Sequence, residues 1–344
     1  MKKIFITGIC GFVGSNLALF FKDHNYEVYG VDNLLRKGSH KNYLRLKKVG
    51  IKIVMGNLCN NKVLKKIMKK NRFSNLIHCA GFTSVLDGTN LITTKKLYEN
   101  NILSTLNSLE IAKKSNSNFI YISSSRVYSL SVLNSLKLNF KKNYKLSFNN
   151  KLGLSKKGVN ENFSTSSPVS LYGNSKIICE KIIEEYCSIN KISFVINRCG
   201  LLTGGGQLYK NDQGIVSFWI NSWKKSKKLS YIGFNGLGFQ TRDCLHPYDL
   251  ANLLNIQIKK IKKLKKNNKI FNVSGGYDSS FSLKELSEWC CNNIFYRKIK
   301  KANQSRLFDV KWLVLDNSKV KKVFKWKIKY KKNKIFKDIL NENN

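Results

Sequence analysis

The chain has 344 residues, of which 42% are hydrophobic and 24% charged, a composition typical of a folded protein and not of a disordered one. At about 100–200 residues per domain, this length allows two domains, or one large α/β domain with an appended lobe. Lysine and arginine number 62 against 20 acidic residues, which gives a formal net charge of +42. No run of about 18 apolar residues occurs, so we expect no membrane-spanning helix.

The positive charge comes mainly from lysine, which is spread from Lys2 to Lys337 beside abundant Asn and Ile and only two prolines. Nucleic-acid-binding proteins instead concentrate charge on one face and favour arginine. We therefore interpret the charge as a drift toward AT-rich codons, and we expect neither a nucleic acid nor a membrane as partner. The alternatives are a field that attracts an anionic substrate, or binding to nucleic acid or a membrane surface.

The nine cysteines form no CxxC pair, which indicates buried thiols in a reducing compartment. Lys2 and Lys3 precede an apolar run, but Gly8, Gly11 and Gly14 interrupt it and no Ala-x-Ala cleavage site follows, unlike in a signal peptide. The four histidines are too dispersed to predict a metal site. We expect a cytoplasmic protein without a metal.

The first half of the chain alternates short β-branched runs with amphipathic stretches. Strands are predicted over Lys3–Thr7, Glu27–Val31, Lys52–Val54, Asn75–Cys79, Asn118–Ser123 and Ser193–Asn197, and helices over Val13–Lys22, Lys62–Lys70, Leu91–Lys114 and Tyr172–Asn190. Such alternation is typical of βαβ units with right-handed crossovers. The predicted fold class is therefore α/β: a Rossmann-type, doubly wound parallel sheet with a smaller mixed α/β C-terminal substrate lobe.

Residues 129–167 interrupt this alternation, because they are rich in Asn, Lys and Ser and show little periodicity. They predict a long loop, either functional or disordered. Helical patterns return at Gln213–Lys224, Pro247–Lys263 and Ser282–Asn292, between glycine clusters at 204–206 and 233–238. We predict one domain over residues 1–198, with contributions from about 240–275, and a second lobe mainly over 199–344. The lysine-rich last ~20 residues are expected to form a solvated surface.

The first predicted strand leads into a GxxGxxG turn whose glycines are Gly8, Gly11 and Gly14. Glycine lets the backbone approach a pyrophosphate, and the start of the following helix offers free N–H groups and a positive dipole. The second predicted strand leads to Asp32, whose carboxylate can accept hydrogen bonds from ribose hydroxyls and would repel a 2′-phosphate. The pattern predicts a dinucleotide site that favours NAD over NADP, although Arg36 and Lys37 lie nearby. The domain over residues 1–198 is therefore expected to bind NAD, and the lobe over 199–344 mainly the substrate.

Tyr172 and Lys176 are four residues apart on a predicted helix, so their side chains share one face. A phenol has a pKa of about 10 and is a poor base at neutral pH, but a nearby cation favours its ionised form. The serines at 123–125 end the preceding strand, at the sheet edge where α/β proteins bind ligands. A hydroxyl there can hold the substrate oxygen that a tyrosine deprotonates.

In this order, the three motifs resemble those of the extended short-chain dehydrogenase/reductases that act on nucleotide sugars, and the resemblance covers nearly the whole chain. Within that family the chain is most similar to the CDP-tyvelose (CDP-paratose) 2-epimerase-like group. The similarity lies at residues 32–39 (DNLLRKGS), 123–128 (SSSRVY), 168–176 (PVSLYGNSK), 197–200 (NRCG), 211–215 (NDQGI), 231–234 (YIGF) and 238–246 (GFQTRDCLH).

The resemblance implies a catalytic set of Ser124, Tyr172 and Lys176, with the tyrosine as general base and the lysine on the nicotinamide ribose. Ser124 is chosen among the three serines because the family's hydroxyl lies four residues before the tyrosine equivalent to Tyr128. The implied NAD contacts are Gly8, Gly11, Phe12, Val13, Gly14, Asp32, Asn33, Arg36, Asn57, Leu58, Ala80, Asn101, Tyr172 and Lys176. The implied contacts with a nucleotide-diphosphate sugar are Ser125, Arg126, Gln207, Gln213, Arg242 and Arg306.

The implied reaction is epimerisation of a sugar hydroxyl carbon, C2 in the group named, through a transient ketose and tightly bound NAD. A 4-epimerase or a nucleotide-sugar dehydrogenase/reductase of the same family, and a non-catalytic nucleotide-binding module, are the alternatives. Dehydration is disfavoured because Ser125 and Arg126 stand where sugar-nucleotide 4,6-dehydratases carry Asp and Glu. The resemblance also implies a homodimer that pairs through helices such as Leu91–Lys114 and Tyr172–Asn190. The chain departs from the family's usual residues at Asn57, at 80–82 (AGF) and at Ser129.

Overall fold

A computed structural model describes residues 2–70, 72–84, 90–147, 151–209, 213–265 and 268–342. The chain forms two units, which are treated separately below. Unit 1 consists of residues 1–124, 171–198 and 247–271, and unit 2 of residues 125–170, 199–246 and 272–344. Residues 125–170 thus group with the C-terminal half of the chain. In the described part of the chain, no helix has the length and apolar character needed to cross a bilayer.

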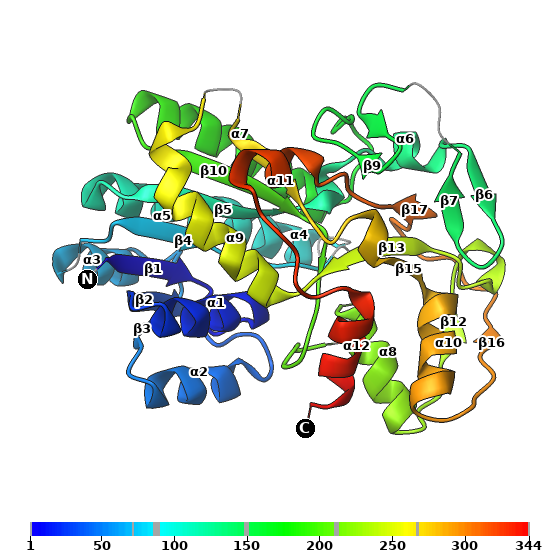
Figure 1. Ribbon diagram of the computed structural model, residues 1–344. Helices are drawn as coiled ribbons and strands as arrows, with labels where there is room; N and C mark the ends of the chain where they lie inside the picture. Colours follow the sequence, from blue (N-terminus) through cyan, green and yellow to red (C-terminus); the bar gives the residue numbers. More distant parts are fainter. Residues whose placement is uncertain are drawn as a thin grey trace. The chain divides into compact units, whose positions relative to one another are not determined.

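The central sheet has seven strands in the order β14-β10-β5-β4-β1-β2-β3 (Figure 1). β1 pairs in parallel with β2 and β4, β2 with β3, and β4 with β5. This order is that of a doubly wound sheet, whose strand order reverses at β1 and β4. The strands are β1 Lys3–Thr7, β2 Glu27–Asp32, β3 Lys52–Met55, β4 Asn75–His78, β5 Asn118–Ser124, β10 Phe194–Cys199 and β14 Ile270–Val273.

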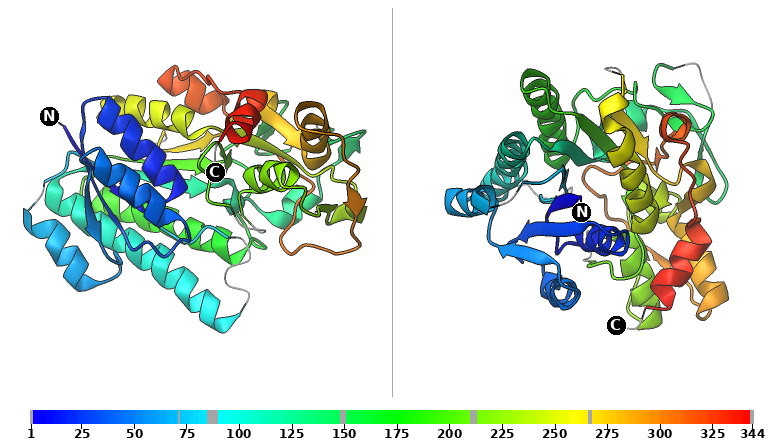
Figure 2. Two further views of the ribbon diagram at one scale, coloured as in Figure 1. Left: turned by 90° about the horizontal axis from the view of Figure 1, so that it is seen from below. Right: turned by 60° about the vertical axis from the view of Figure 1, so that its left-hand side comes forward.

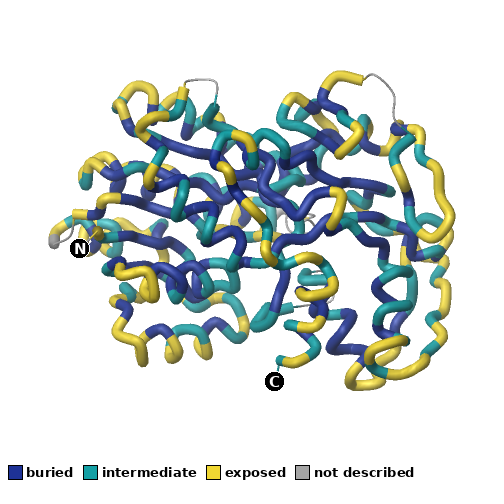
Figure 3. Tube along the Cα trace, in the orientation of Figure 1, coloured by how far each residue is buried: buried dark blue, intermediate teal, exposed yellow. Residues whose placement is uncertain are grey.

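Helices cover both faces of the sheet in unit 1 (Figure 2). They are α1 Phe12–Asp23, α2 Ser39–Lys48, α3 Asn61–Lys70, α4 Leu91–Tyr98, α5 Ser104–Ser115, α7 Leu171–Ile189 and α9 Pro247–Lys260. Successive strand residues point to opposite faces, and Phe5, Leu76 and Phe119 share one apolar cluster with residues of α3, α5 and α7. α1 packs against α9. The inner strands are accordingly buried, whereas the edge strand β3 is partly exposed, and most other exposure is in helices and loops (Figure 3).

The predicted fold class and the six predicted strands are confirmed, and each strand is found within two residues of its predicted bounds. The predicted helix Leu91–Lys114 is divided, because the π-helical segment Glu99–Leu103 separates α4 from α5. Helix α2 was missed. It has only two buried residues, Ser39 and Leu46, so its sequence has no clear apolar stripe.

Unit 2 is built around a mixed sheet in which β13 pairs in parallel with β11 and β17 and antiparallel with β15. Its strands are β11 Leu201–Leu202, β13 Thr241–Leu245, β15 Ser280–Ser282 and β17 Trp312–Leu313, and the parallel pair β12 Ser230–Tyr231 and β16 Lys300–Lys301 lies outside it. The helices are α8 Ile215–Lys224, α10 Leu283–Asn293, α11 Ser318–Phe324 and α12 Lys332–Leu340.

The expectation of a structureless loop over 129–167 is wrong for its described residues. The segment contains helix α6 Leu130–Asn134 and two antiparallel pairs, β6 Leu138–Phe140 with β7 Tyr144–Leu146 and β8 Leu154–Ser155 with β9 Gly158–Val159. Residues 148–150 lie outside the described part. These strands are two or three residues long, too short for a period-2 pattern to be recognised.

The lysine-rich C-terminus is likewise more than a solvated surface. Helix α12 buries Ile335, Phe336 and Ile339 in the core of unit 2. Its Asp338 accepts hydrogen bonds from the Gly205 N–H (2.7 Å) and from His246 (3.1 Å). The frequent lysines conceal an apolar stripe with i, i+1, i+4 spacing, and this stripe fixes the helix.

Candidate active site

The glycine turn closes β1 onto α1 in unit 1 as the motif predicts. Gly8 has a positive φ of 65°, and a Cβ on Gly14 would lie 2.2 Å from the Gly8 carbonyl oxygen. Helix α1 begins at Phe12, and its N-cap is Gly11, which provides no side-chain cap. The N–H groups of the first turn, at Phe12 and Val13, therefore donate no hydrogen bond to an N-cap side chain. This cradle fits a pyrophosphate.

Asp32, at the end of β2, is tied to this turn. Its carboxylate accepts hydrogen bonds from the N–H groups of Cys10 and Leu34, both at 2.8 Å. Burial raises the pKa of Asp32, and the backbone donors around it counteract that shift. Asn33 is exposed and Arg36 is partly exposed at the following turn. The structure thus brings Asp32 together with the glycine turn, as expected for a ribose ligand beside a phosphate cradle.

The loop after β4 is fixed to β1 through a buried histidine. His78 Nδ1 lies 2.7 Å from Thr7 Oγ1, which accepts hydrogen bonds from the N–H groups of Cys79 and Ala80, both at 3.2 Å. A Cβ on Gly8 would lie 2.9 Å from the Ala80 Cα, so the glycine turn and this loop are in close contact. The packing of the glycine turn against this loop therefore fixes the position of Ala80, an expected cofactor contact, relative to the turn.

Asn101 joins the same loop to helix α7. It is buried in the π-helical segment, where its Oδ1 accepts from the Phe82 N–H (2.7 Å) and its Nδ2 donates to Ser175 Oγ (2.9 Å). π-helical turns are frequent at functional sites. The two other expected cofactor contacts lie next to β3: Asn57 is exposed and accepts from the Cys59 N–H, whereas Leu58 is buried.

Tyr172 and Lys176 lie on the first turns of α7 and are 7% and 4% exposed. Lys176 Nζ donates to the Ile122 carbonyl oxygen at 3.3 Å, and it lies near Gly81, 3.9 Å from where a Cβ would stand. Ser124, the last residue of β5, is partly exposed. The expected catalytic residues thus stand at the carboxyl end of β5 and on the first turns of α7, beside the loop that Asn101 and Ala80 share.

A buried ion pair lies behind this site. Arg198 donates to Glu180 at 2.7–3.2 Å, and the Ser123 hydroxyl donates to the same carboxylate at 2.5 Å. The side chains of Arg198 and Glu180 are 8% and 2% exposed. The pair connects β10 and α7 to the end of β5, one residue before Ser124.

Three of the expected substrate contacts gather in unit 2, although they are far apart in the sequence. Arg242 donates to Asp309 (3.1 Å) and to the Val310 carbonyl oxygen (2.7 Å). Burial lowers the pKa of Arg242 to about 10, and the positive charges of Arg126 and Arg306 contribute to the shift. Three guanidinium groups with two carboxylates, Asp309 and Asp243, leave an excess of positive charge, and guanidinium groups suit the bidentate recognition of phosphate.

The other expected substrate contacts are placed less favourably. Both ends of the Gln207 amide are engaged within unit 2, because Oε1 accepts from Thr203 and Ser217 and Nε2 donates to the Leu202 carbonyl oxygen. Gln213 is partly exposed directly before α8, and its motif neighbours at 211 and 212 lie outside the described residues. Ser125 is partly exposed after β5.

Sequence reasoning missed the residues that hold the expected ones in place: Thr7, His78, Tyr121, Glu180 and Asp309. No local pattern identifies them, since each contacts a residue that is distant in the sequence. The signal that was available is their chemistry. A carboxylate in an apolar helix and a histidine in an apolar strand both require a buried partner.

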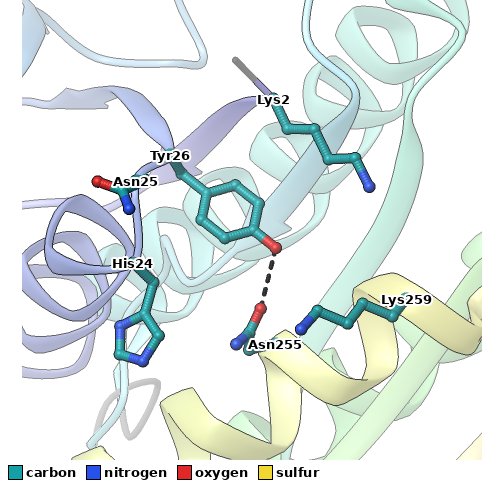
Figure 4. A pocket seen from close by; sticks show the side chains of 6 residues that line it. All are labelled: Lys2, His24, Asn25, Tyr26, Asn255 and Lys259. Atoms are coloured by element: carbon teal, nitrogen blue, oxygen red, sulfur yellow. Dashed lines mark hydrogen bonds between the residues drawn. The ribbon is translucent and has the colours of Figure 1, made fainter.

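A pocket of about 310 Å³ lies elsewhere in unit 1, lined by Lys2, His24, Asn25, Tyr26, Asn255 and Lys259 (Figure 4). The Tyr26 hydroxyl donates to Asn255 Oδ1 at 2.9 Å across it. Lys2 and Tyr26 precede β1 and β2, so the pocket is at the amino edge of the sheet, opposite the glycine turn. It is therefore separate from the candidate site. Among the described residues, no cluster of His, Cys, Asp and Glu could hold a metal ion.

Comparison with known proteins shows a family match over most of the chain. The model of the NAD dependent epimerase/dehydratase family matches residues 4–274. A CDP-paratose 2-epimerase of Salmonella typhi is 30% identical over 289 residues, 83% of this chain and 82% of that protein. A dTDP-D-glucose 4,6-dehydratase of Dictyostelium discoideum is 29% identical over 264 residues, 76% of this chain and 56% of that protein.

Solved structures show the same fold. A UDP-glucuronic acid 4-epimerase from Bacillus cereus, in complex with UDP-glucuronic acid and NAD, aligns with a TM-score of 0.77 at 21% identity and covers 99% of this chain and 98% of its own. A UDP-glucose 4-epimerase from Bifidobacterium longum, in complex with NAD+ and UDP, aligns with a TM-score of 0.76 at 20% identity, covering 99% and 97%. At these identities the likeness establishes the fold.

Proposed function

Because the chain belongs to the NAD dependent epimerase/dehydratase family, whose cofactor is NAD, we propose that it is a nucleotide-sugar epimerase that inverts a hydroxyl-bearing carbon. The carbon proposed is C2, since the CDP-paratose 2-epimerase of Salmonella typhi matches over most of both chains. The observation that carries the proposal is the buried Tyr172–Lys176 pair on α7, beside the loop held by Asn101. Without that pair, the fold alone would indicate only nucleotide binding.

In this proposal the residues of unit 1 hold NAD and carry out proton transfer. The first turn of α1 binds the pyrophosphate, Asp32 accepts from the ribose hydroxyls, and Lys176 donates to the nicotinamide ribose. Bound NAD supplies the oxidation and reduction. Tyr172 removes a proton from the sugar hydroxyl and later returns it, and Ser124 holds the same oxygen by a hydrogen bond.

The residues of unit 2 bind the substrate in this proposal. Arg126, Arg242 and Arg306 neutralise the diphosphate, whose charge suits their shared excess of positive charge. Gln213 contacts the nucleotide, whereas Gln207 supports the loop before α8 through the bonds described above. Ser125 and Arg126 also oppose a dehydratase reaction, because neither side chain can protonate a leaving hydroxyl at neutral pH.

The test is a panel of CDP-, UDP-, GDP- and dTDP-sugars followed by NMR for inversion at C2 or C4. We expect inversion of one sugar without added NAD, and NAD released when the purified protein is denatured. Inversion at C4 alone would identify a 4-epimerase, and turnover only with added NAD or NADH would identify a net oxidoreductase. Bound NAD with no reaction on any sugar would indicate a non-catalytic binding module.

Asp32→Ala is expected to weaken NAD binding and to improve tolerance of NADP. The change removes the carboxylate that accepts from the ribose and would repel a 2′-phosphate. It also removes the hydrogen bonds to the Cys10 and Leu34 N–H groups, so the turn loosens. Affinities for NAD and NADP are measured by titration calorimetry after removal of bound cofactor, and an unchanged ratio of the two would contradict the assigned role.

Arg242→Lys is expected to raise KM for the nucleotide sugar about 10–150-fold, because charge-assisted hydrogen bonds contribute ~1.5–3 kcal/mol. Lysine keeps the charge but loses the planar fork that engages Asp309 and the Val310 carbonyl oxygen. Steady-state kinetics separate KM from kcat, and kcat is expected to change much less. Arg297→Lys is the matched control, since it makes the same exchange at an arginine that lies over the Trp223 ring and outside the arginine cluster of Arg126, Arg242 and Arg306.

We also propose a homodimer and a cytoplasmic location. Leu103 and Leu106, at the end of the π-helical segment and on α5, and Ile189, at the end of α7, are apolar and exposed on the helices expected to pair. All nine cysteines are free thiols, as in a reducing compartment. Sedimentation analysis of the purified protein tests the dimer.

A further inference from the structure

Lys176 has an unusual environment for a buried ammonium group. Besides the Ile122 carbonyl oxygen at 3.3 Å, its Nζ lies 4.8 Å from the centre of the Tyr121 ring. The face of an aromatic ring carries negative electrostatic potential and attracts a cation, most strongly where water is excluded. Tyr121 is 1% exposed, so the contact is made in such a place. The ring therefore supplies part of the stabilisation that water would otherwise give.

The Tyr121 ring also contacts a buried histidine. It stacks on the His78 imidazole, with centroids 5.6 Å apart and planes 16° apart. Three hydroxyl groups surround His78: Thr7 Oγ1 at 2.7 Å and Ser108 Oγ at 3.0 Å from Nδ1, and Thr105 Oγ1 at 3.1 Å from Nε2. Burial lowers the pKa of His78 to about 3, so the ring is neutral and does not repel Lys176.

The other ionisable groups near Lys176 and Tyr121 are uncharged or bonded to other residues, so the Tyr121 ring is a principal contact of the Lys176 ammonium. Burial raises the pKa of Cys79 to about 12, so this thiol is uncharged. Glu180 is paired with Arg198, and Cys179 donates to the Asn101 carbonyl oxygen. The Tyr121 hydroxyl is close to Cys179. It is the ring, and not this hydroxyl, that Lys176 lies over.

We propose that Tyr121 is a positioning residue whose ring face, backed by His78, holds the Lys176 ammonium where it stabilises the Tyr172 phenolate. The proposal rests on the function proposed above, in which Tyr172 and Lys176 act as a pair. It assigns the role to the ring and not to the hydroxyl. It also assigns His78 a role besides packing, because the stacked His78 and Tyr121 rings connect the loop that carries Ala80 to Lys176.

The test compares Tyr121→Phe, which keeps the ring, with Tyr121→Leu, which removes it, in the protein with NAD bound. Tyrosines labelled with ¹³C at Cζ are titrated by NMR, and the Tyr172 signal is assigned by its loss in Tyr172→Phe. We expect Tyr121→Phe to ionise Tyr172 as the wild type does. In Tyr121→Leu the ionisation should move upward by about one pH unit, since a displaced ammonium favours the phenolate less.

Tyr29→Leu is the matched control. Tyr29 is a buried tyrosine of the same apolar cluster, and Lys52 lies over its ring at 5.0 Å. Its removal should lower stability without moving the titration of Tyr172. If Tyr121→Leu does not fold, Tyr121→Met fills the space without a ring and replaces it.

The proposal is overturned if Tyr121→Leu or Tyr121→Met titrates as the wild type, or if Tyr121→Phe shifts the titration as much as they do. Because the titration needs no substrate, its result stands even if no sugar in the panel is inverted. Conversely, an active epimerase with an unmoved titration would refute only the role of Tyr121. Where a substrate is found, the acidic limb of the pH profile of kcat should move upward in Tyr121→Leu together with the titration of Tyr172. In Tyr121→Phe the limb should lie where it does in the wild type.

Discussion

Tyr172→Phe is expected to lower turnover about 10²–10⁴-fold, the usual contribution of a positioned general base. The change removes one hydroxyl from a side chain that is 7% exposed, so the ring continues to fill its place on α7. The backbone carbonyl of residue 172 still accepts from Ser175 Oγ, which keeps Asn101 and the loop after β4 in position. NAD binding should therefore remain nearly unchanged, and the loss should fall on kcat. The measurement is steady-state turnover of the sugar identified by the panel, with NAD content determined on the same sample.

Tyr98→Phe is the matched control for this experiment. It also removes a tyrosine hydroxyl next to α7, where Tyr98 donates to Asn174 Oδ1 at 2.8 Å, but it does not touch the proposed catalytic set. We expect it to retain turnover within a few fold. Wild-type turnover in Tyr172→Phe would remove Tyr172 from the mechanism, and an equal loss in both variants would show that the loss came from disturbance of α7.

Periodicity was sufficient to predict six of the seven strands of the central sheet, all but β14, and most of the helices beside it. Strands such as Lys3–Thr7 are short, β-branched and bounded by turn residues, and doubly wound folds follow from their alternation with helices. Helix α2 and helix α12 show where this reasoning fails. In both, lysine and other polar residues outnumber the apolar ones, and tertiary packing supplies what the local pattern does not show.

The candidate site was predictable to the extent that its residues lie in local motifs. The glycine turn lies between β1 and α1, Asp32 ends the next strand, and Tyr172 and Lys176 are one turn apart on α7, so each can be identified from its own local pattern. The arginine cluster is different: Arg126, Arg242 and Arg306 were named only through resemblance, and Asp309, which holds Arg242, was not named. Contacts between distant segments depend on the complete fold, and no single segment encodes them.

Arg198→Met is expected to destabilise the protein by ~3–5 kcal/mol, because it leaves the Glu180 carboxylate buried without its cation. The arginine donates through both Nε and Nη2 to this carboxylate, and the two side chains are 8% and 2% exposed. Of the contacts described for the carboxylate, only the Ser123 hydroxyl would remain. Methionine fills much of the volume of the arginine side chain. The loss of stability therefore comes from the unpaired Glu180 charge and not from a cavity. Urea unfolding followed by far-UV circular dichroism measures the change.

The double variant Arg198→Met with Glu180→Met separates the charge from the packing. Removing both ions also removes the cost of burying them, so the double variant should be more stable than Arg198→Met alone. It should still be less stable than the wild type, because the Ser123 hydroxyl loses its acceptor at a cost of ~1–3 kcal/mol. Since Ser123 precedes Ser124 at the end of β5, this variant should also lower turnover while folded. Equal stability of the single and double variants would contradict this account, because it would show that the unpaired Glu180 carboxylate is not what destabilises Arg198→Met.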